Sequence, residues 1–348
     1  TPMPMVCNRK RTVVTEEVAV GEKVAVLLCG YGEVEEYDEF AEYNERSFKL
    51  LVSKSIKFPD FSIPFLSRRL ERAQKKEWHA ANHYHSPHND IFEQQREGIE
   101  TNLREVYGDD VGVFKTFNFV PPYLPDQVLR EIRSQGFEKL VIYPWLVVDS
   151  VFTSGLALEQ INEALQPDPS WVKDMRYLPS FWEREDFQQR LIDQTEEAIA
   201  PLLETYAASQ VGVMLCMHGC PLESKGYETG VRESEALFYA LQESLVRKYP
   251  LITPGWMNHP VPGKWTTPDV DQAAKNLITL GAKAIVFVPI GFVTENHETQ
   301  LDIGYTIDKV KDQVECVQLP TLNDDPALLR MGAEWIRPLV DELRTVAD

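Results

Sequence analysis

The sequence lacks several features that mark large classes of protein. No stretch of about 18 or more apolar residues occurs, so we expect no transmembrane helix. Basic residues are few: 35 lysines and arginines stand against 54 aspartates and glutamates, which gives a net charge of −19. A surface that negative repels phosphate backbones and argues against nucleic acid as a partner, although a local basic patch could still bind a small anion.

Cysteine is also scarce. The five cysteines are scattered and odd in number, which does not match the disulfide framework of a secreted protein. Cys216 and Cys220 flank His218, but no second cysteine pair follows, so a structural zinc site is not expected. Residues 1–20 contain no signal-peptide core. We therefore expect a soluble protein inside the cell, either in the cytoplasm or in the matrix or stroma of an organelle.

Several short motifs are missing as well. The sequence contains neither GxxxxGK[ST] nor GxGxxG, so a nucleotide cofactor is not indicated. No GxSxG motif occurs, which argues against an ordinary serine hydrolase.

What the chain does contain is an alternation of two patterns. Short apolar runs rich in valine and isoleucine predict strands at 24–29, 111–117, 139–143, 211–217 and 284–290. Apolar residues recur at helical spacing at 38–54, 91–106, 126–135, 155–165, 187–205, 233–248, 269–280 and 326–346. Continuous apolar strands alternating with helices predict an α/β fold with mainly parallel sheets.

A faint internal repeat indicates two similar halves. GFEKLVIYP from Gly136 and GAKAIVFVP from Gly281 both read as a helix-ending glycine, a buried strand and a proline. The chain thus divides into halves at 20–185 and 190–348, and the helix at 326–346 could pack back on the first half. Chance similarity between valine-rich strands is the alternative to a true repeat.

The first candidate for chemistry is His218. It directly follows the strand at 211–217, and in such folds ligands bind at the carboxyl ends of the strands. A neutral imidazole there could accept a proton or bind a metal ion. The alternative is a structural histidine that is hydrogen-bonded at the end of the strand.

The second candidate is the acidic segment TENHETQLD at 294–302. Glu295, Glu298 and Asp302 are spaced so that a helix would place all three carboxylates on one face. Clustered acids raise one another's pKa and suit a dication. The alternative is a helix start, with Thr294 as N-cap and the acids favouring the helix dipole. His297 adds a second imidazole.

Two further groups are less specific. Trp256, His259 and Trp265 share a loop rich in proline and glycine, where they could line an apolar ligand or simply anchor the loop. Four histidines, at positions 79, 83, 85 and 88, fall in EWHAANHYHSPH. Their spacing could suit a metal ion, but without nearby cysteine or paired carboxylates we interpret this segment as a solvated loop.

Together these segments resemble the ferrochelatase family, whose members insert ferrous iron into a porphyrin to make haem. The resemblance rests on MHGCP at 217–221, WMNHPVPGKWTTPDV at 256–270 and VPIGFVTENHETQLDI at 288–303. Weaker similarity runs through VAVLLCGYG and YPWLVVDSVFTSG. The resemblance implies two Rossmann-like, doubly wound halves with parallel sheets and a cleft between them.

The resemblance also implies roles for individual residues. His218 matches the active-site histidine, which would accept pyrrole protons, and Glu298 matches the glutamate that faces it across the porphyrin. Glu295 and Asp302 match acids that continue the carboxylate chain behind that glutamate, and Glu298 together with Asp302 would move protons or metal. The implied substrate-binding residues are Trp256, Trp265, Tyr31 and Ser154. The implied metal ligands are His218, Glu298 and His297.

The resemblance implies a porphyrin and a divalent metal, Fe²⁺, as substrates and no permanently bound cofactor. A [2Fe–2S] cluster is not expected, because no cysteine follows Cys316. The chain departs from the family where a histidine is replaced by Asn296, with His297 one place later. Two alternatives therefore stay open. One is a tetrapyrrole-binding or regulatory protein without catalysis. The other is a chelatase for another metal, such as cobalt or nickel, or for a more carboxylated tetrapyrrole.

Overall fold

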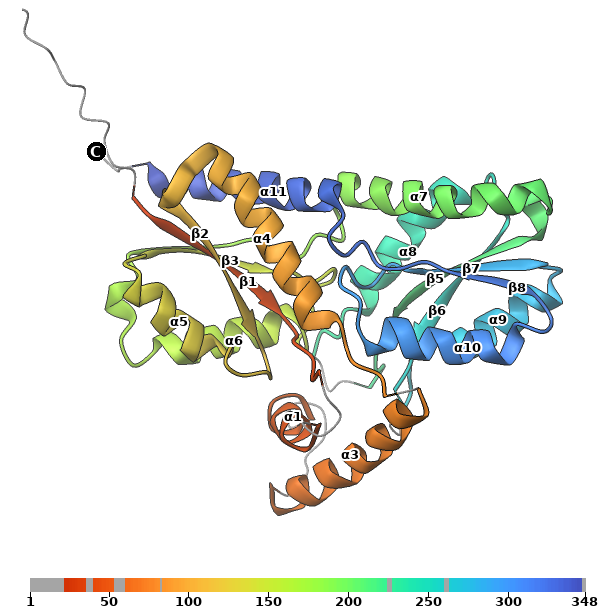
Figure 1. The fold of residues 1–348 in the computed structure, drawn as a ribbon, viewed down its shortest axis with the longest axis horizontal. Helices are drawn as coiled ribbons and strands as arrows, with labels where there is room; N and C mark the ends of the chain where they lie inside the picture. The colour runs from red at the N-terminus through yellow and green to blue at the C-terminus, as the bar shows by residue number, and fades with distance from the viewer. Residues whose placement is uncertain are drawn as a thin grey trace, which may run out of the picture.

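The chain folds into two four-stranded parallel sheets that lie side by side, each covered by helices (Figure 1). The computed structural model describes residues 22–35, 40–52, 60–81, 83–223, 227–259 and 263–345. The first sheet has the order β2-β1-β3-β4 and the second β6-β5-β7-β8. The strands are β1 (Val24–Gly30), β2 (Val111–Phe117), β3 (Lys139–Pro144), β4 (Asp174–Tyr177), β5 (Val211–His218), β6 (Leu251–Met257), β7 (Ala284–Pro289) and β8 (Glu315–Gln318).

The helices cover both faces of the sheets. They are α1 (Phe40–Ser47), α3 (Ile63–Ala80), α4 (His88–Tyr107), α5 (Pro125–Ser134), α6 (Ser154–Leu165), α7 (Glu185–Ile199), α8 (Val231–Leu245), α9 (Val270–Thr279), α10 (Ile303–Val310) and α11 (Pro326–Arg344). Short π-helical turns, Phe48–Val52 and Glu298–Asp302, follow α1 and precede α10. None of the helices in the described part of the chain is both long and apolar enough to cross a membrane.

The two halves share one core and each keeps a second core of its own. Residues of α4, α7, α8 and α11 pack with both sheets in a single apolar cluster. On the opposite faces, α5 and α6 pack against the first sheet, and α9 and α10 pack against the second. The central strands are buried on both faces, which explains why they read as uninterrupted apolar runs.

The predicted α/β class is confirmed, and so are the five predicted strands. The identical strand order in the two sheets supports the internal repeat. Gly136 and Gly281 follow α5 and α9 with φ of 78° and 102°, a region in which only glycine is unstrained. The sequence missed β4, β6 and β8. Strands β4 and β8 are short and partly polar, and β6 contains Pro254, which an edge strand tolerates.

The predicted helices were also found, with two additions. The helix expected at 38–54 is α1 and the π-helical turn after it, and its two ends lie outside the described residues. The sequence did not predict α3 or the separate helix α10. The first sheet draws on residues 24–177 and the second on residues 211–318.

The C-terminal helix α11 packs on α4 of the first half, and Gly98 of α4 and Gly332 of α11 permit the close approach. A Cβ at Gly332 would lie 2.8 Å from the Trp145 ring, which is fully buried.

We expect Gly332→Ala to lower the free energy of unfolding by about 1–2 kcal/mol through overpacking. Gly304 in α10 is the matched control, because a Cβ there meets nothing within 4 Å. Gly304→Ala should raise the free energy of unfolding by about 0.5–1 kcal/mol. Urea denaturation of both variants measures these changes. Equal effects on the stability of Gly332→Ala and Gly304→Ala would contradict the prediction.

Candidate functional site

The carboxyl ends of β5, β6 and β7 bring three potential metal ligands together. His218 is the last residue of β5, His259 lies two residues beyond β6, and Glu298 opens the π-helical turn after β7. Gly219 joins the first two strand ends, because its N–H donates to the Met257 carbonyl at 2.8 Å. A Cβ at Gly219 would lie 2.6 Å from that carbonyl oxygen, so only glycine fits there. The sequence order His-Gly therefore positions His218 beside His259.

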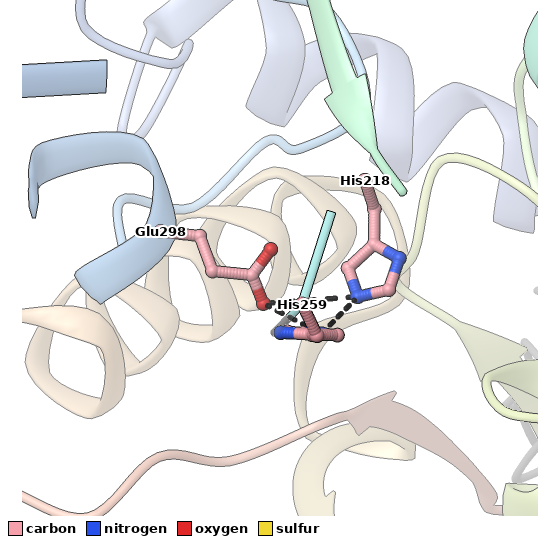
Figure 2. A group of neighbouring side chains, drawn as sticks. All are labelled: His218, His259 and Glu298. Atoms are coloured by element: carbon pink, nitrogen blue, oxygen red, sulfur yellow. Dashed lines mark hydrogen bonds and ion pairs between the residues drawn. The ribbon is translucent and has the colours of Figure 1, made fainter. Parts of the chain in front are cut away.

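The three side chains point toward one another (Figure 2). The two imidazole Nε2 atoms are 3.1 Å apart, and Glu298 Oε1 lies 3.7 Å from that of His218 and 3.9 Å from that of His259. With bonds of about 2.1 Å, the ligand atoms around a tetrahedral ion are about 3.4 Å apart. The three atoms thus approximate one face of such a site. A fourth position is left for water or a substrate.

The electrostatics suit a metal site. Although 44% of the His218 side chain and 38% of the His259 side chain reach solvent, desolvation by the surrounding protein lowers the pKa of each to about 4. Both rings are therefore neutral near pH 7, which is the form that binds a metal ion. Glu298 Oε2 is buried and has no hydrogen-bond partner among the described residues.

His297 lies elsewhere. We expected it as a metal ligand with His218 and Glu298, but its Nδ1 contacts the Glu33 carboxylate, which comes from the loop after β1. Burial opposes the charge on His297, but Glu33 outweighs burial and raises the pKa of His297 to about 10. Asn296 does not reach the metal ligands either, since its side chain bonds the Thr294 carbonyl and the Thr299 N–H. The imidazole that joins the expected pair is thus His259.

The two remaining acids have different surroundings. Glu295 anchors its segment, accepting hydrogen bonds from the Thr321 N–H at 2.7 Å and the Thr299 hydroxyl at 3.0 Å. Asp302 ends the π-helical turn that Glu298 begins. Burial and the nearby Glu298 carboxylate raise the pKa of Asp302 to about 7. Asp302 can therefore take up and release a proton near neutral pH, whereas Glu295 is committed to structural hydrogen bonds.

A small cavity of about 30 Å³ lies between the halves. Tyr31 after β1, Trp145 after β3 and Phe292 after β7 contribute aromatic rings, and His88 contributes an imidazole. An aromatic wall of this kind suits a flat apolar ligand. A cavity of this size is far smaller than a tetrapyrrole.

The expected substrate-binding residues are dispersed. Tyr31 lines the cavity, and the Trp265 ring lies 5.9 Å from the His259 ring. Trp256, by contrast, is only 2% exposed and belongs to the shared core, so its side chain offers almost no surface to a ligand. Ser154 is buried as the first residue of α6.

Sequence reasoning missed the positions of three site residues. His259 was noticed only as part of an aromatic loop, because Pro254 hid the strand that presents it. Nothing in the sequence marked Glu33 as a site residue except its position after a predicted strand. The interpretation of EWHAANHYHSPH as a solvated loop was wrong at His88, which is 8% exposed at the start of α4, although His83 and His85 are exposed.

The sequence matches a known protein family over most of its length. A sequence model of the family described as Ferrochelatase matches residues 23–339. A ferrochelatase of Synechococcus elongatus is 25% identical over 331 residues, which cover 92% of this chain and 84% of that protein. A ferrochelatase of Gloeothece citriformis is 27% identical over 259 residues, 72% of this chain and 65% of the relative.

Solved structures show a similar fold. SirB from Bacillus subtilis with Fe³⁺ superimposes with a TM-score of 0.52 at 12% identity, covering 93% of this chain and 96% of SirB. DR2241 from Deinococcus radiodurans, described as structurally similar to chelatases, has a TM-score of 0.51 at 12% identity. That match covers 94% of this chain and 56% of DR2241.

Proposed function

Because this chain belongs to the ferrochelatase family, we propose that it inserts ferrous iron into protoporphyrin IX in the cleft between its two halves. The family and the chelatase-like fold support metal insertion into a tetrapyrrole as the general activity. The convergence of His218, His259 and Glu298 on one point carries the proposal (Figure 2). A porphyrin and a divalent metal ion are the substrates.

The geometry suggests how the metal ion would be received. The neutral Nε2 atoms of His218 and His259 and the Glu298 carboxylate would hold the dication on three sides, with the open position facing the macrocycle. Glu298 and Asp302 begin and end one π-helical turn, and Asp302 can exchange protons near neutral pH. Asp302 would thus move protons between the site and solvent.

The macrocycle would bind in the aromatic cavity. Rings of Tyr31 and Phe292 would stack against it once the cavity has widened to admit it, and a tight apolar site offsets the cost of bending a macrocycle whose nitrogens resist leaving their plane. Insertion exchanges two protons for a dication without any change of oxidation state. The proposal therefore includes no resident redox cofactor and no [2Fe–2S] cluster.

One observation favours a second candidate function, insertion of cobalt or nickel. His259 gives the site two imidazoles and one carboxylate, a more nitrogen-rich set than the expected pair of His218 and Glu298. Imidazole ligands suit several late first-row dications, and affinity generally rises from Fe²⁺ through Co²⁺ to Ni²⁺. Replacing His259 with alanine should therefore reduce cobalt insertion more than iron insertion.

The test is anaerobic mixing of the purified protein with protoporphyrin IX and Fe²⁺, Co²⁺ or Ni²⁺, following the absorbance change of metallation. A more carboxylated tetrapyrrole is run in parallel. Insertion of iron into protoporphyrin IX supports the first proposal, and preference for cobalt or nickel supports the second. Tight binding without metallation by any ion would overturn both and leave a tetrapyrrole-binding protein.

A further inference from the structure

Metal insertion needs a base other than the metal ligands, and this inference rests on the proposed function. A free-base tetrapyrrole carries two pyrrole N–H groups, and both protons must leave as a dication enters. An imidazole nitrogen has one lone pair, which can bind a metal ion or accept a proton but not both at once. While His218 and His259 hold the ion through Nε2, those nitrogens cannot accept a pyrrole proton, which is the role that the resemblance implied for His218.

Only one of the other histidines is placed to accept a pyrrole proton. The sequence has seven. His297 Nδ1 contacts the Glu33 carboxylate, and His297 does not line the cavity. The exposed histidines at 79, 83 and 85 lie at the end of α3 and in the loop after it, and none of them lines the cavity. One imidazole remains, that of His88.

His88 has a fixed tautomer, with its hydrogen on Nδ1 and a lone pair on Nε2. Its Nδ1 lies 3.3 Å from the Glu295 carbonyl oxygen, which can only accept, so Nδ1 carries the hydrogen. Burial lowers the pKa of His88, so the ring is neutral near pH 7 and Nε2 holds the lone pair. That Nε2 is buried and has no hydrogen-bond partner among the described residues. A buried polar atom without a partner requires an explanation.

The surroundings of His88 indicate what it meets. His88 is 8% exposed and lines the cavity between the halves. The centroid of its ring lies 6.2 Å from that of Phe92. Tyr31, Trp145 and Phe292 complete an aromatic wall. A single basic nitrogen in such a wall suits a flat aromatic ligand that carries an N–H donor. A free-base tetrapyrrole has this chemistry.

We propose that His88 is a second catalytic residue, which accepts a pyrrole proton from the bound macrocycle at Nε2. The pyrrole N–H bond breaks, its electron pair stays on the pyrrole nitrogen to bind the dication, and an Nε2–H bond forms. The second pyrrole proton would go to the carboxylate of Asp302, which ends the π-helical turn that Glu298 begins and which carries protons to solvent in the proposed function. His88 and the metal ligands thus divide the two tasks, with His88 from the first half and the ligands from the second.

The charged groups around His88 permit this step. Glu33 and the Glu295 carbonyl favour the imidazolium, and the charged His297 opposes it. Glu33 is itself paired with His297, so the two charges largely cancel at His88. Burial is the largest effect on His88 and opposes the imidazolium, so the proton taken up at Nε2 would be released again after the metal ion has entered the macrocycle.

The experiment compares His88→Gln and His88→Phe with wild type and with His85→Gln, which removes an exposed imidazole from the same loop. Glutamine offers an amide in place of Nε2 but is not basic, so it can hydrogen-bond a ligand without taking its proton. The assays are Zn²⁺ binding, protoporphyrin IX binding by fluorescence, and the rate of zinc insertion. We expect both His88 variants to bind zinc and protoporphyrin within about threefold of wild type, yet to insert zinc about 100-fold more slowly.

Each outcome decides between stated alternatives. Normal insertion by His88→Gln would overturn the proposal and make His88 a hydrogen-bonding or water-bound residue. A loss of porphyrin binding that accounts for the lost rate would overturn it in favour of a binding role. Wild-type protein that inserts no metal would overturn the proposed function, and with it this step. An active wild type with normal His88 variants would overturn this step alone.

Discussion

The variant His218→Ala should insert metal into protoporphyrin IX at least about 100-fold more slowly than wild type. The imidazole is one of three groups that approximate the face of a tetrahedral site, and its Nε2 lies 3.1 Å from that of His259. Without it, the ion keeps one imidazole and one carboxylate and has no fixed position relative to the macrocycle. The side chain is 44% exposed, so the fold should survive the change. The rate of metallation is the measurement.

Chemical rescue provides the control for this prediction. Alanine leaves a gap the size of an imidazole beside His259 and Glu298, so added free imidazole should restore part of the rate by acting as the missing ligand. A surface histidine variant such as His85→Gln should neither lose activity nor respond to imidazole. An activity of His218→Ala within about threefold of wild type would show that His218 neither binds the metal ion nor takes part in proton transfer.

The largest expected effect on stability comes from Gln95→Leu. Gln95 is fully buried on α4 and makes four hydrogen bonds, three of which join the first half to the second. Its amide nitrogen donates to the carbonyls of Val293 and Asn323 at 2.9 and 2.8 Å. Its oxygen accepts from Trp145 Nε1 at 3.0 Å and from the Thr294 hydroxyl at 2.8 Å. Leucine has a similar size but leaves all four partners without Gln95.

We expect Gln95→Leu to lower the free energy of unfolding by about 3 kcal/mol or more, because each buried group left unpaired costs about 1–3 kcal/mol. Gln94→Leu is the matched control, since the same change at the adjacent, exposed residue of α4 should alter it by no more than about 0.5 kcal/mol. Urea denaturation measures both variants. Equal midpoints for the two would mean that the Gln95 hydrogen bonds do not hold the halves together.

The sequence predicted the parts of the site that follow directly from strands. His218 ends an apolar strand, and Glu298 lies in an acidic segment after another, so the rule that ligands bind at the carboxyl ends of parallel strands pointed to both. The fold was predictable for the same reason, since buried parallel strands are continuous apolar runs. Edge strands such as β6 escaped because their pairing on one side only tolerates proline and polar residues.

Contacts between segments that lie far apart along the chain could not be predicted from the sequence. Glu33 and His297 are 264 residues apart, and nothing local indicates that the loop after β1 meets the π-helical turn. The resemblance to the family implied that a histidine expected at position 296 stands at 297 in this chain. It could not show that one residue of shift turns that side chain to Glu33 while His259 joins His218. His88 also needed the fold, because its burial depends on the Glu295 carbonyl of the other half.

The central claim is that His218, His259 and Glu298 receive a divalent metal ion, and Co²⁺ binding without any tetrapyrrole tests it most directly. Cobalt bound by two imidazoles and a carboxylate in four-coordinate geometry has intense visible absorption bands, whereas hydrated cobalt is only weakly coloured. We expect a single ion to bind per chain with the intense spectrum, to lose that spectrum in His218→Ala and to show it weakened in His259→Ala. Absence of binding, or an unchanged spectrum when all three residues are replaced together, would contradict the account.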